Sequence, residues 1–336
     1  MRRTIGEGRR LMEYMPEFEI VRPATLAEAV AARADDPGAA LIAGGTDLVP
    51  NIRRGIAAPA KVIDLNGVRE IRTIEAAEDG LRIGAAVTLA EVIGDERVRA
   101  GYAGVVEAAG AVAANSHREV GTVGGNLCLD TRCVFYNQSE WWRRSNDYCL
   151  KSRGDICHVA PKGNHCFAAF SGDLAPALIV YAADAEIASP SGDRTIPLAE
   201  MYRDDGRDHL MLGPDEMLAS VTLPAPPDGF RAGYAKSRVR GAIDFPLAGV
   251  AAGLMLDGDA VAELRIALTG TNSMPLLLDG TEALGGAPLD DAALVRLVDL
   301  IPKQIQPMTS TFSPPGYRRR VVANLMRSLV RRLYEG

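Results

Sequence analysis

Two glycine-centred stretches carry the strongest structural signal in this chain: Ala43-Gly-Gly-Thr-Asp-Leu48 and Thr122-Val-Gly-Gly-Asn-Leu127. Each follows a segment that predicts regular structure: an apolar run for the first, and an alanine-rich stretch with the polar residues 115–119 for the second. Glycines let the backbone approach an anion closely, and consecutive N–H groups can then surround a phosphate. Neither stretch matches the glycine pattern of a Rossmann turn or a Walker loop. Either one alone is also compatible with an ordinary tight turn, because paired glycines are common in turns.

Helices and strands surround these loops without a strict βαβ order. Thr25 and Thr88 each stand three residues before a glutamate, which predicts capped helices at 26–34 and from 88 onward. Apolar runs predict strands at 39–43, 61–65, 81–87, 177–181, 185–189, 233–239, 249–256 and 261–269. Further helices are expected at 104–113, at 290–301 and after Pro314-Pro315. This mixture predicts α+β domains rather than a doubly wound sheet.

Length and charge exclude several classes of protein. A chain of 336 residues suggests two or three domains. With 37 Lys and Arg against 43 Asp and Glu, the net charge of −6 argues against a nucleic-acid partner. The longest strongly apolar run, Leu174 to Ala183, is about half of a membrane span, so no membrane partner is expected. No apolar segment follows the twin arginine near the N-terminus, so a signal peptide is not predicted and a cytoplasmic location is expected.

The five cysteines all lie between Cys128 and Cys166. An odd number without a secretory signal makes a disulfide framework improbable. From Cys133 onward the spacing C-x₁₅-C-x₇-C-x₈-C fits no common zinc knuckle, whereas a folded loop can deliver four thiolates to an iron–sulfur cluster at irregular spacing. His158 and His165 each adjoin a cysteine and are alternative ligands, although a solvent-facing position is expected for both.

Two later motifs complete a family resemblance. Ser171-Gly-Asp-Leu-Ala-Pro176 and Tyr234-Ala-Lys-Ser-Arg-Val-Arg240, followed by Asp244, stand in the same order as in the flavoprotein subunits of molybdenum hydroxylases, the xanthine oxidase and CO dehydrogenase group. The chain resembles that family from about residue 16 to its C-terminus. The resemblance implies an α+β fold with a two-subdomain FAD-binding part of the PCMH/VAO type and a C-terminal α+β domain of the CO dehydrogenase flavoprotein type. The expected parts are an N-terminal tail at 1–15, FAD-binding subdomains at 16–76 and 77–226, a proline-rich linker at 224–229 and the C-terminal domain at 229–336.

The resemblance also implies where FAD binds. Both glycine loops would contact its pyrophosphate, whose negative charge suits backbone N–H groups. The cofactor-binding residues implied are Ala43, Gly44, Gly45, Thr46, Asp47, Leu48, His117, Thr122, Gly124, Gly125 and Asn126. Asp173 would lie near the ribityl chain, and Lys236 near the isoalloxazine ring, where a cation would stabilise the reduced flavin. No catalytic residue is expected in this chain.

The cysteines lie in a segment that the simplest members of this family lack. Asn126 and Asp173 are 47 positions apart, so an insertion occupies about residues 128–170, and it needs an organising centre of its own. The runs Asp130-Thr-Arg-Cys133 and Tyr136-Asn-Gln-Ser-Glu-Trp-Trp142 resemble the flavin subunit of 4-hydroxybenzoyl-CoA reductase, where this loop carries a 4Fe-4S cluster. That likeness implies four ligands: Cys133, Cys149, Cys157 and Cys166. Cys128, where relatives commonly have a small residue, is expected to pack beneath the flavin loop.

The function implied is electron transfer in a cytoplasmic complex that degrades aromatic compounds. The expected partners are a large subunit with the molybdenum cofactor, a small subunit with 2Fe-2S clusters and a ferredoxin-type carrier, assembled as a dimer of heterotrimers. Electrons would pass through 4Fe-4S and FAD towards molybdenum, where 4-hydroxybenzoyl-CoA loses its phenolic hydroxyl. Two alternatives stay open: a related molybdenum enzyme with another substrate, and a zinc-stabilised binding module.

Overall fold

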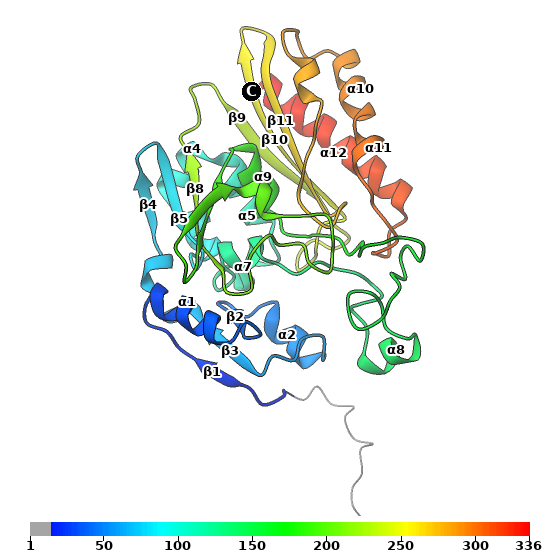
Figure 1. Ribbon diagram of the computed structural model, residues 1–336. Helices are drawn as coiled ribbons and strands as arrows, with labels where there is room; N and C mark the ends of the chain where they lie inside the picture. The colour runs from blue at the N-terminus through cyan, green and yellow to red at the C-terminus, as the bar shows by residue number, and fades with distance from the viewer. Residues whose placement is uncertain (1–14) are drawn as a thin grey trace, which may run out of the picture.

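The computed structural model describes residues 15–336, so the expected N-terminal tail lies outside the described residues except for Met15 (Figure 1). Its strands form three sheets that follow one another along the chain. Among the described residues, no helix is both long and apolar enough to cross a membrane. The α+β fold class predicted from the sequence is confirmed.

The first sheet is small and parallel, with strand order β1-β3-β2. Its elements are β1 (Glu19–Val21), α1 (Leu26–Asp35), β2 (Ala40–Ile42), α2 (Leu48–Arg53) and β3 (Lys61–Asp64). Helix α1 begins after Thr25, whose hydroxyl accepts the Glu28 N–H at 3.2 Å, as the sequence predicts. The helix buries Ala29 and Val30 against the sheet side that carries Ile63.

The second sheet has five antiparallel strands in the order β4-β5-β8-β6-β7. Its strands are β4 (Ile74–Ala77), β5 (Gly80–Gly84), β6 (Asp184–Ala188), β7 (Arg194–Pro197) and β8 (Met217–Pro224). The helices of this part are α3 (Leu89–Gly94), α4 (Glu96–Gly101), α5 (Ala103–Ala111), α6 (Asn115–Arg118), α7 (Val123–Leu127), α8 (Glu140–Ser145) and α9 (Leu174–Val180). The capping box predicted at Thr88 is complete, because Glu91 and Thr88 each bond the other's backbone N–H.

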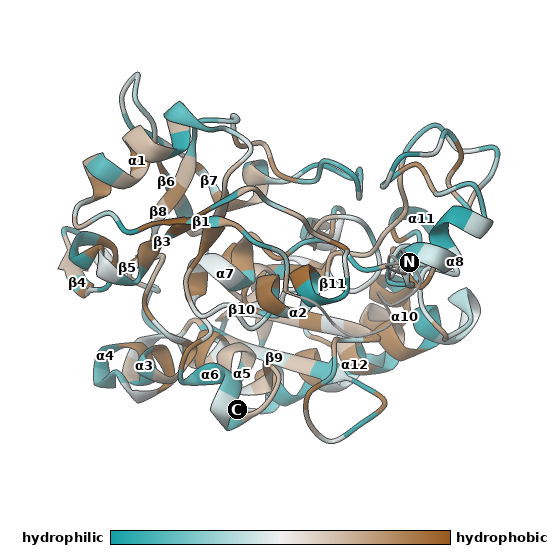
Figure 2. Ribbon diagram, turned by 90° about the horizontal axis from the view of Figure 1, so that it is seen from below, coloured by the Kyte–Doolittle hydropathy of each residue, from teal (hydrophilic) through white to brown (hydrophobic). Residues whose placement is uncertain are grey.

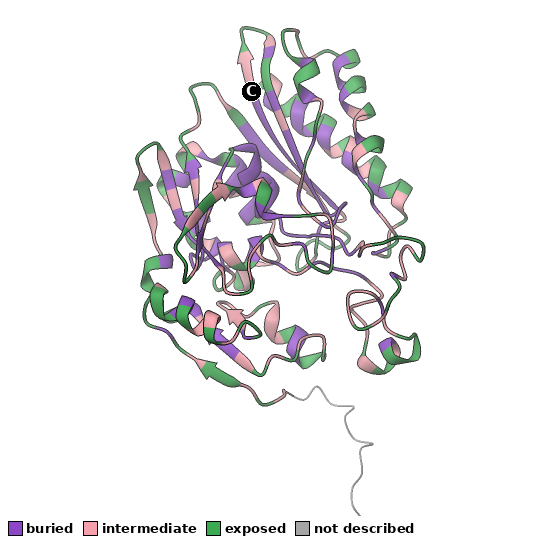
Figure 3. Cartoon of the chain, viewed as in Figure 1, coloured by how far each residue is buried: buried purple, intermediate pink, exposed green. Residues whose placement is uncertain are grey.

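The strand predicted at 177–181 is wrong, because these residues belong to helix α9 and its C-terminal end. Every residue of α9 is buried, so the helix has no polar face and its sequence shows no period of 3.6. A short continuous apolar run cannot distinguish a buried helix from a buried strand. Figure 3 shows α9 as a buried element between the second sheet and the strands that follow, and it packs against β10, β11 and α5.

The third sheet has four antiparallel strands in the order β12-β11-β10-β9. Its elements are β9 (Arg231–Ser237), β10 (Ala248–Asp257), β11 (Ala260–Thr269), β12 (Leu276–Leu277), α10 (Asp291–Asp299), α11 (Ile301–Gln304) and α12 (Pro315–Glu335). The helix predicted at 290–301 therefore ends early and is followed by a separate short turn, α11. Helix α12 buries Val322, Met326 and Leu329 against β10, as its apolar stripe predicts. Figure 2 shows the complementary pattern on the outside, where α4 and α8 are strongly hydrophilic.

Candidate functional site

Both glycine loops line one cavity of about 660 Å³, a size typical of small-molecule sites. Its wall also includes the base of the insertion and the loop that carries Ile243, Asp244 and Phe245 from the C-terminal part. Twelve of the flavin-binding residues predicted from the sequence line it: Ala43, Gly44, Gly45, Thr46, Asp47, Leu48, His117, Thr122, Gly124, Gly125, Asn126 and Asp173. The structure therefore brings together motifs that are up to 130 positions apart.

The first loop joins β2 to α2 and packs directly on the second. A Cβ at Gly44 would lie 1.9 Å from the Val120 carbonyl oxygen, so only glycine permits this approach. Gly45 has a φ of +68°, in the left-handed region that favours glycine. The two glycines thus bring the backbone of this loop to the cavity wall. The first N–H groups of α2 are already engaged, because Val49 donates to the Gly45 carbonyl at 3.0 Å and Asn51 to the Asp47 carbonyl at 3.2 Å.

The second loop begins α7 and contains two glycines with different surroundings. The Thr122 hydroxyl accepts the Gly125 N–H at 3.1 Å and caps the helix. A Cβ at Gly124 would meet the Cβ of Ala85 at 2.8 Å, so Gly124 is required for packing on β5. A Cβ at Gly125 would meet only the Thr122 hydroxyl, at 3.2 Å. The missing side chain of Gly125 therefore leaves space on the cavity side.

A buried ion pair supports the end of the cavity that Asp173 lines. The Lys236 ammonium lies 2.9 Å from Oδ2 of Asp173 and donates to the Ala111 carbonyl at 3.1 Å. The Tyr234 hydroxyl donates to Oδ1 of Asp173 at 2.6 Å. Burial raises the pKa of Asp173, and Lys236 opposes this shift; burial likewise lowers the pKa of Lys236. Lys236 lies behind Asp173 and is not among the residues that line the cavity.

Cys157 lies at the centre of a dense set of donors in the insertion. The Cys166 thiol donates to Cys157, and the backbone N–H groups of Phe167, Ala160 and Val159 do the same. These bonds lower the pKa of Cys157 to about 5 against the opposing effect of burial. These donors favour the thiolate form of Cys157, which is the form that binds metals.

The other predicted ligands share this environment. All four cysteines are buried and none forms a disulfide: Cys133, Cys149, Cys157 and Cys166. The pKa of Cys133 is raised to about 11, mainly by burial and in smaller part by the neighbouring Cys149 and Cys157. The backbone N–H groups of Phe135 and Tyr136 donate to the Cys133 sulfur. Ala168 donates to Cys166 at 3.5 Å. Cys149 and Cys157 thus lie near Cys133, Cys166 lies beside Cys157, and backbone N–H groups donate to the sulfur atoms of Cys133, Cys157 and Cys166.

The two histidines and the fifth cysteine, which the sequence also offered as neighbours of the cluster, pack against other groups. The ring of His158 packs on Phe135 with centroids 5.7 Å apart, and its Nε2 is buried without a partner in the described chain, which differs from the solvent-facing position expected. His165 stacks on Phe167 at 4.0 Å. Cys128 lines the flavin-loop cavity instead, and burial raises its pKa to about 12. Within residues 15–336, no three His, Cys, Asp or Glu side chains are placed to hold a single metal ion.

The insertion is attached at its neck and on both sides. Arg132 and Ala169 exchange backbone hydrogen bonds of 2.7 and 2.8 Å, which close the neck. The buried Lys151 ammonium donates to Asp130 at 2.6 Å, beside this neck. Further bonds run from Arg54 to the Asn137 carbonyl, from Arg143 to the Gly55 carbonyl, from Val134 N–H to the Ser310 carbonyl and from the Ser273 hydroxyl to the Cys166 carbonyl. The insertion thus contacts both the first FAD-loop region and the C-terminal part.

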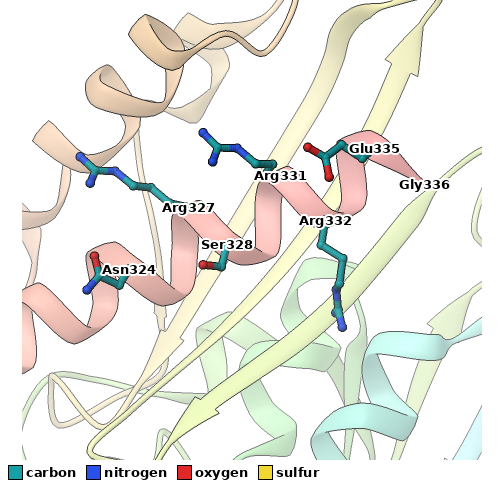
Figure 4. Close-up of a pocket in the computed structure, with 7 residues that line it drawn as sticks. All are labelled: Asn324, Arg327, Ser328, Arg331, Arg332, Glu335 and Gly336. Carbon is teal, nitrogen blue, oxygen red and sulfur yellow. The ribbon is translucent and has the colours of Figure 1, made fainter.

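A second hollow lies along the end of α12 and contains none of the predicted site residues (Figure 4). Its arginines point to different neighbours. Arg332 pairs with Glu107 at 2.8 Å, and Arg331 with Asp291 at 2.8 Å. These contacts attach α12 to α5 and α10, so the hollow is a by-product of packing at the helix surface.

Two family models cover almost all of the described chain. Residues 16–226 match the FAD binding domain in molybdopterin dehydrogenase, and residues 232–333 match the CO dehydrogenase flavoprotein C-terminal domain. The first match alone spans more than half of the chain. The chain belongs to the FAD-binding subunits of the xanthine oxidase family of molybdenum enzymes.

Individual relatives agree with this membership. The chain is 34% identical to the FAD-binding subunit of an aldehyde oxidoreductase from Escherichia coli K12, over 80% of this chain and 86% of the relative. It is 26% identical to the carbon monoxide dehydrogenase medium chain of Afipia carboxidovorans, over 94% of this chain and 96% of the relative. A crystal structure of Cu,Mo-CO dehydrogenase shares the fold with a TM-score of 0.79 at 23% identity, covering 96% of this chain and 99% of that one.

The cavity of this FAD-binding subunit fits the cofactor. The first loop brings its glycine backbone to the cavity wall, where N–H groups can meet a diphosphate. In the second loop the N–H groups of Gly124 and Gly125 bond Ala85 and Thr122, and its contribution is the space left in front of Gly125. The sequence did not identify two arginines of the cavity wall, Arg54 and Arg132, of which Arg132 pairs with Asp47. Arg132 belongs to the run Asp130-Thr-Arg-Cys133, but that run pointed only to a role for its cysteine. Tyr136 lines the cavity as well and was not predicted.

Proposed function

We propose that this chain is the electron-transferring subunit of a 4-hydroxybenzoyl-CoA reductase-type molybdenum enzyme, holding FAD in the cavity and a 4Fe-4S cluster on the insertion. The observation that supports the cluster best is the set of four buried, unpaired cysteines, three of which accept backbone N–H bonds. Such bonds to thiolate sulfur are typical of iron–sulfur sites and tune their potentials. FAD and the cluster would supply the redox chemistry between an external carrier and the partner subunits.

The side chains of this subunit would position both groups. The two glycine loops would hold the diphosphate, and Asp173 would face the ribityl side with its charge balanced by Lys236. Cys133, Cys149, Cys157 and Cys166 would each bind one iron. Their burial keeps water away from the sulfur atoms, while Tyr136 both lines the cavity and packs on the cysteine cluster. The two proposed sites are therefore adjacent.

The location of the insertion supports a role for it in electron exchange with a carrier such as a ferredoxin. It interrupts the chain between Asn126 and Asp173. The Leu174 N–H, next to Asp173, donates to the Asn126 side-chain oxygen at 2.9 Å. Both ends of the insertion are thus anchored at the cavity. Its far part exposes Trp141 and Ile156, at 75% and 52% of their surface. A carrier could dock there while the large and small subunits bind other faces.

A second candidate is the same subunit in a molybdenum enzyme that oxidises its substrate. The relatives favour it, since they include the subunits of an aldehyde oxidoreductase and a xanthine dehydrogenase. Steady-state assays of the purified complex would separate the two. Reduction of 4-hydroxybenzoyl-CoA by a low-potential donor supports the first proposal, whereas oxidation of aldehydes or purines without that reduction supports the second.

The role of the insertion has its own kinetic test. A complex whose subunit carries Cys157→Ser should lack the cluster but keep flavin and molybdenum. Reduction by a low-potential ferredoxin should then become much slower, while electron exchange between flavin and molybdenum persists. Unchanged ferredoxin-driven turnover would show that the cluster only stabilises the insertion, and it would contradict the proposed electron route.

A further inference from the structure

Arg132 carries an unusual guanidinium at the cavity wall. The residue is nine-tenths buried, at 9% exposure, although it belongs to the inserted segment. Its Nη2 donates to Oδ1 of Asp47, and its Cζ lies 4.9 Å from the ring centroid of Phe245. Its Nη1 is also buried but has no hydrogen-bond partner within residues 15–336. A buried donor without a partner is costly, so this position indicates an acceptor that the protein alone does not supply.

The partner of Arg132 lies in the first glycine loop. Asp47 precedes α2 and also accepts the Asn51 side-chain amide at 3.0 Å. A free carboxylate at this point would repel a diphosphate. Its ion pair with Arg132 removes that repulsion and holds the guanidinium beside the loop. An arginine fork with one nitrogen occupied by a carboxylate still has donors for a phosphate oxygen.

The backbone of the insertion determines this placement. Arg132 exchanges two backbone hydrogen bonds with Ala169, and the next residue is the predicted ligand Cys133. The guanidinium therefore reaches Asp47 from the neck of the insertion, 85 positions along the chain. If the neck moves, the guanidinium moves with it.

We propose that Arg132 is a ligand of the FAD diphosphate, contributed by the insertion to a site that the two glycine loops otherwise form. Asp47 holds Nη2, and Nη1 donates to a phosphate oxygen. The proposal rests on FAD binding in this cavity. It makes flavin affinity depend on a residue of the insertion, so the segment that holds the cysteines also retains the flavin.

The test is an FAD titration of the full chain after reversible removal of the flavin, with iron and acid-labile sulfide measured on the same samples. Arg132→Met keeps the length of the side chain and removes its charge. It should raise the FAD dissociation constant about ten- to hundredfold, the range for a hydrogen bond to a charged group. Arg132→Lys should lie between this variant and the parent. The matched control is Arg153→Met, since Arg153 is an exposed arginine of the insertion that pairs with Glu140.

Each outcome supports or overturns the proposal. An unchanged FAD dissociation constant in Arg132→Met overturns it. Restored FAD affinity in the Asp47→Asn/Arg132→Met double variant also overturns it, because Arg132 would then act only by neutralising Asp47. FAD affinity that stays low in the double variant supports direct contact.

If Arg132→Met loses iron as well, Cys149→Ser serves as reference, because it keeps the guanidinium. Retained FAD in Cys149→Ser supports the proposal, and an equal loss overturns it. Absence of FAD binding by the parent chain would instead contradict the proposed function.

Discussion

Gly125 and Gly44 show that two glycines of the same kind of loop serve different purposes. A side chain at Gly44 would collide with the Val120 carbonyl, whereas one at Gly125 would enter the cavity space beside Thr122. Gly125→Val should therefore fold with its iron content intact but bind FAD at least about tenfold more weakly, since overpacking costs ~1–3 kcal/mol. Flavin and iron analysis of the purified variant measures both quantities.

The control for Gly125→Val is Gly110→Val, because a side chain at Gly110 of α5 meets nothing within 4 Å. It should keep its flavin. Gly44→Ala should differ from both, because its methyl group would push the two loops apart and lower the free energy of unfolding. Full flavin content in Gly125→Val would show that the second loop does not face the cofactor.

Lys236 forms a buried ion pair with Asp173 beside the cavity. It was predicted beside the flavin ring, and the structure places its ammonium on Asp173. Lys236→Met leaves a buried carboxylate without its cation, which should lower the free energy of unfolding by about 3 kcal/mol in urea titrations. Asp173→Asn in the same chain should recover part of this loss. Lys61→Met is the matched control, because Lys61 pairs with the exposed Asp35 and should change stability little. Equal losses in Lys236→Met and Lys61→Met would contradict this account.

At the scale of elements, the insertion depends on its cysteines. Cys157→Ser removes the sulfur that accepts bonds from Cys166 and three backbone N–H groups. We expect it to lose cluster iron and to make residues 128–170 more sensitive to limited proteolysis. Cys128→Ala should change neither quantity, because Cys128 lines the other cavity. Iron loss in Cys128→Ala, with iron retained in Cys133→Ala, would show that Cys128 is a ligand and that Cys133 is the cysteine outside the cluster.

The loop at 205–210 adds a pH-dependent contact at the base of the insertion. His209 is buried and its Nε2–H donates to the Leu129 carbonyl at 3.0 Å; burial lowers the pKa of His209 to about 4. Below its ordinary pKa of about 6.5 the unfolded chain gains a proton that the folded chain does not. Stability is therefore fully present above pH 6.5 and declines as the pH falls towards 4.

This linkage predicts that the free energy of unfolding falls by about 2 kcal/mol between pH 7 and pH 5 through His209 alone. In urea titrations at pH 7 and pH 5, the difference between the two free energies of unfolding should be smaller by that amount in His209→Gln than in the parent. The control is His165→Gln, a histidine substitution in the insertion that leaves the contact between His209 and Leu129 in place. An unchanged difference in His209→Gln would mean that other groups cause the acid sensitivity.

The helices and strands that could be predicted from the sequence are those with a local signal, such as a cap, an apolar run or an apolar stripe. The capped starts of α1 and α3, the apolar runs of β10 and β11 and the stripe of α12 were all visible in the sequence. Helix α9 was not, because burial on every side removes its periodicity. The central strand β8 of the second sheet was also missed, because Ser220 and Thr222 interrupt its apolar run although Ser220 is fully buried in the structure.

At the scale of the whole molecule, the cavity lies where three parts of the chain meet. The family resemblance carried by the glycine motifs named twelve of the residues that line it but not Arg54, Arg132 or Tyr136. The pairing of Asp47 with Arg132 and the approach of Phe245 were not predictable, because both arise from contacts between parts that are distant in sequence. The neighbouring position of the cysteine cluster follows from the same arrangement, since Tyr136 touches both.

The central claim is that one chain holds both a flavin and a four-iron cluster. Its most direct test is the flavin, iron, acid-labile sulfide and zinc content of the full chain purified without oxygen, together with its visible spectrum. We predict about one FAD, four irons and four sulfides per chain, with a broad iron–sulfur absorbance beneath the flavin bands. FAD without iron and sulfide, or stoichiometric zinc in place of iron, would contradict the account.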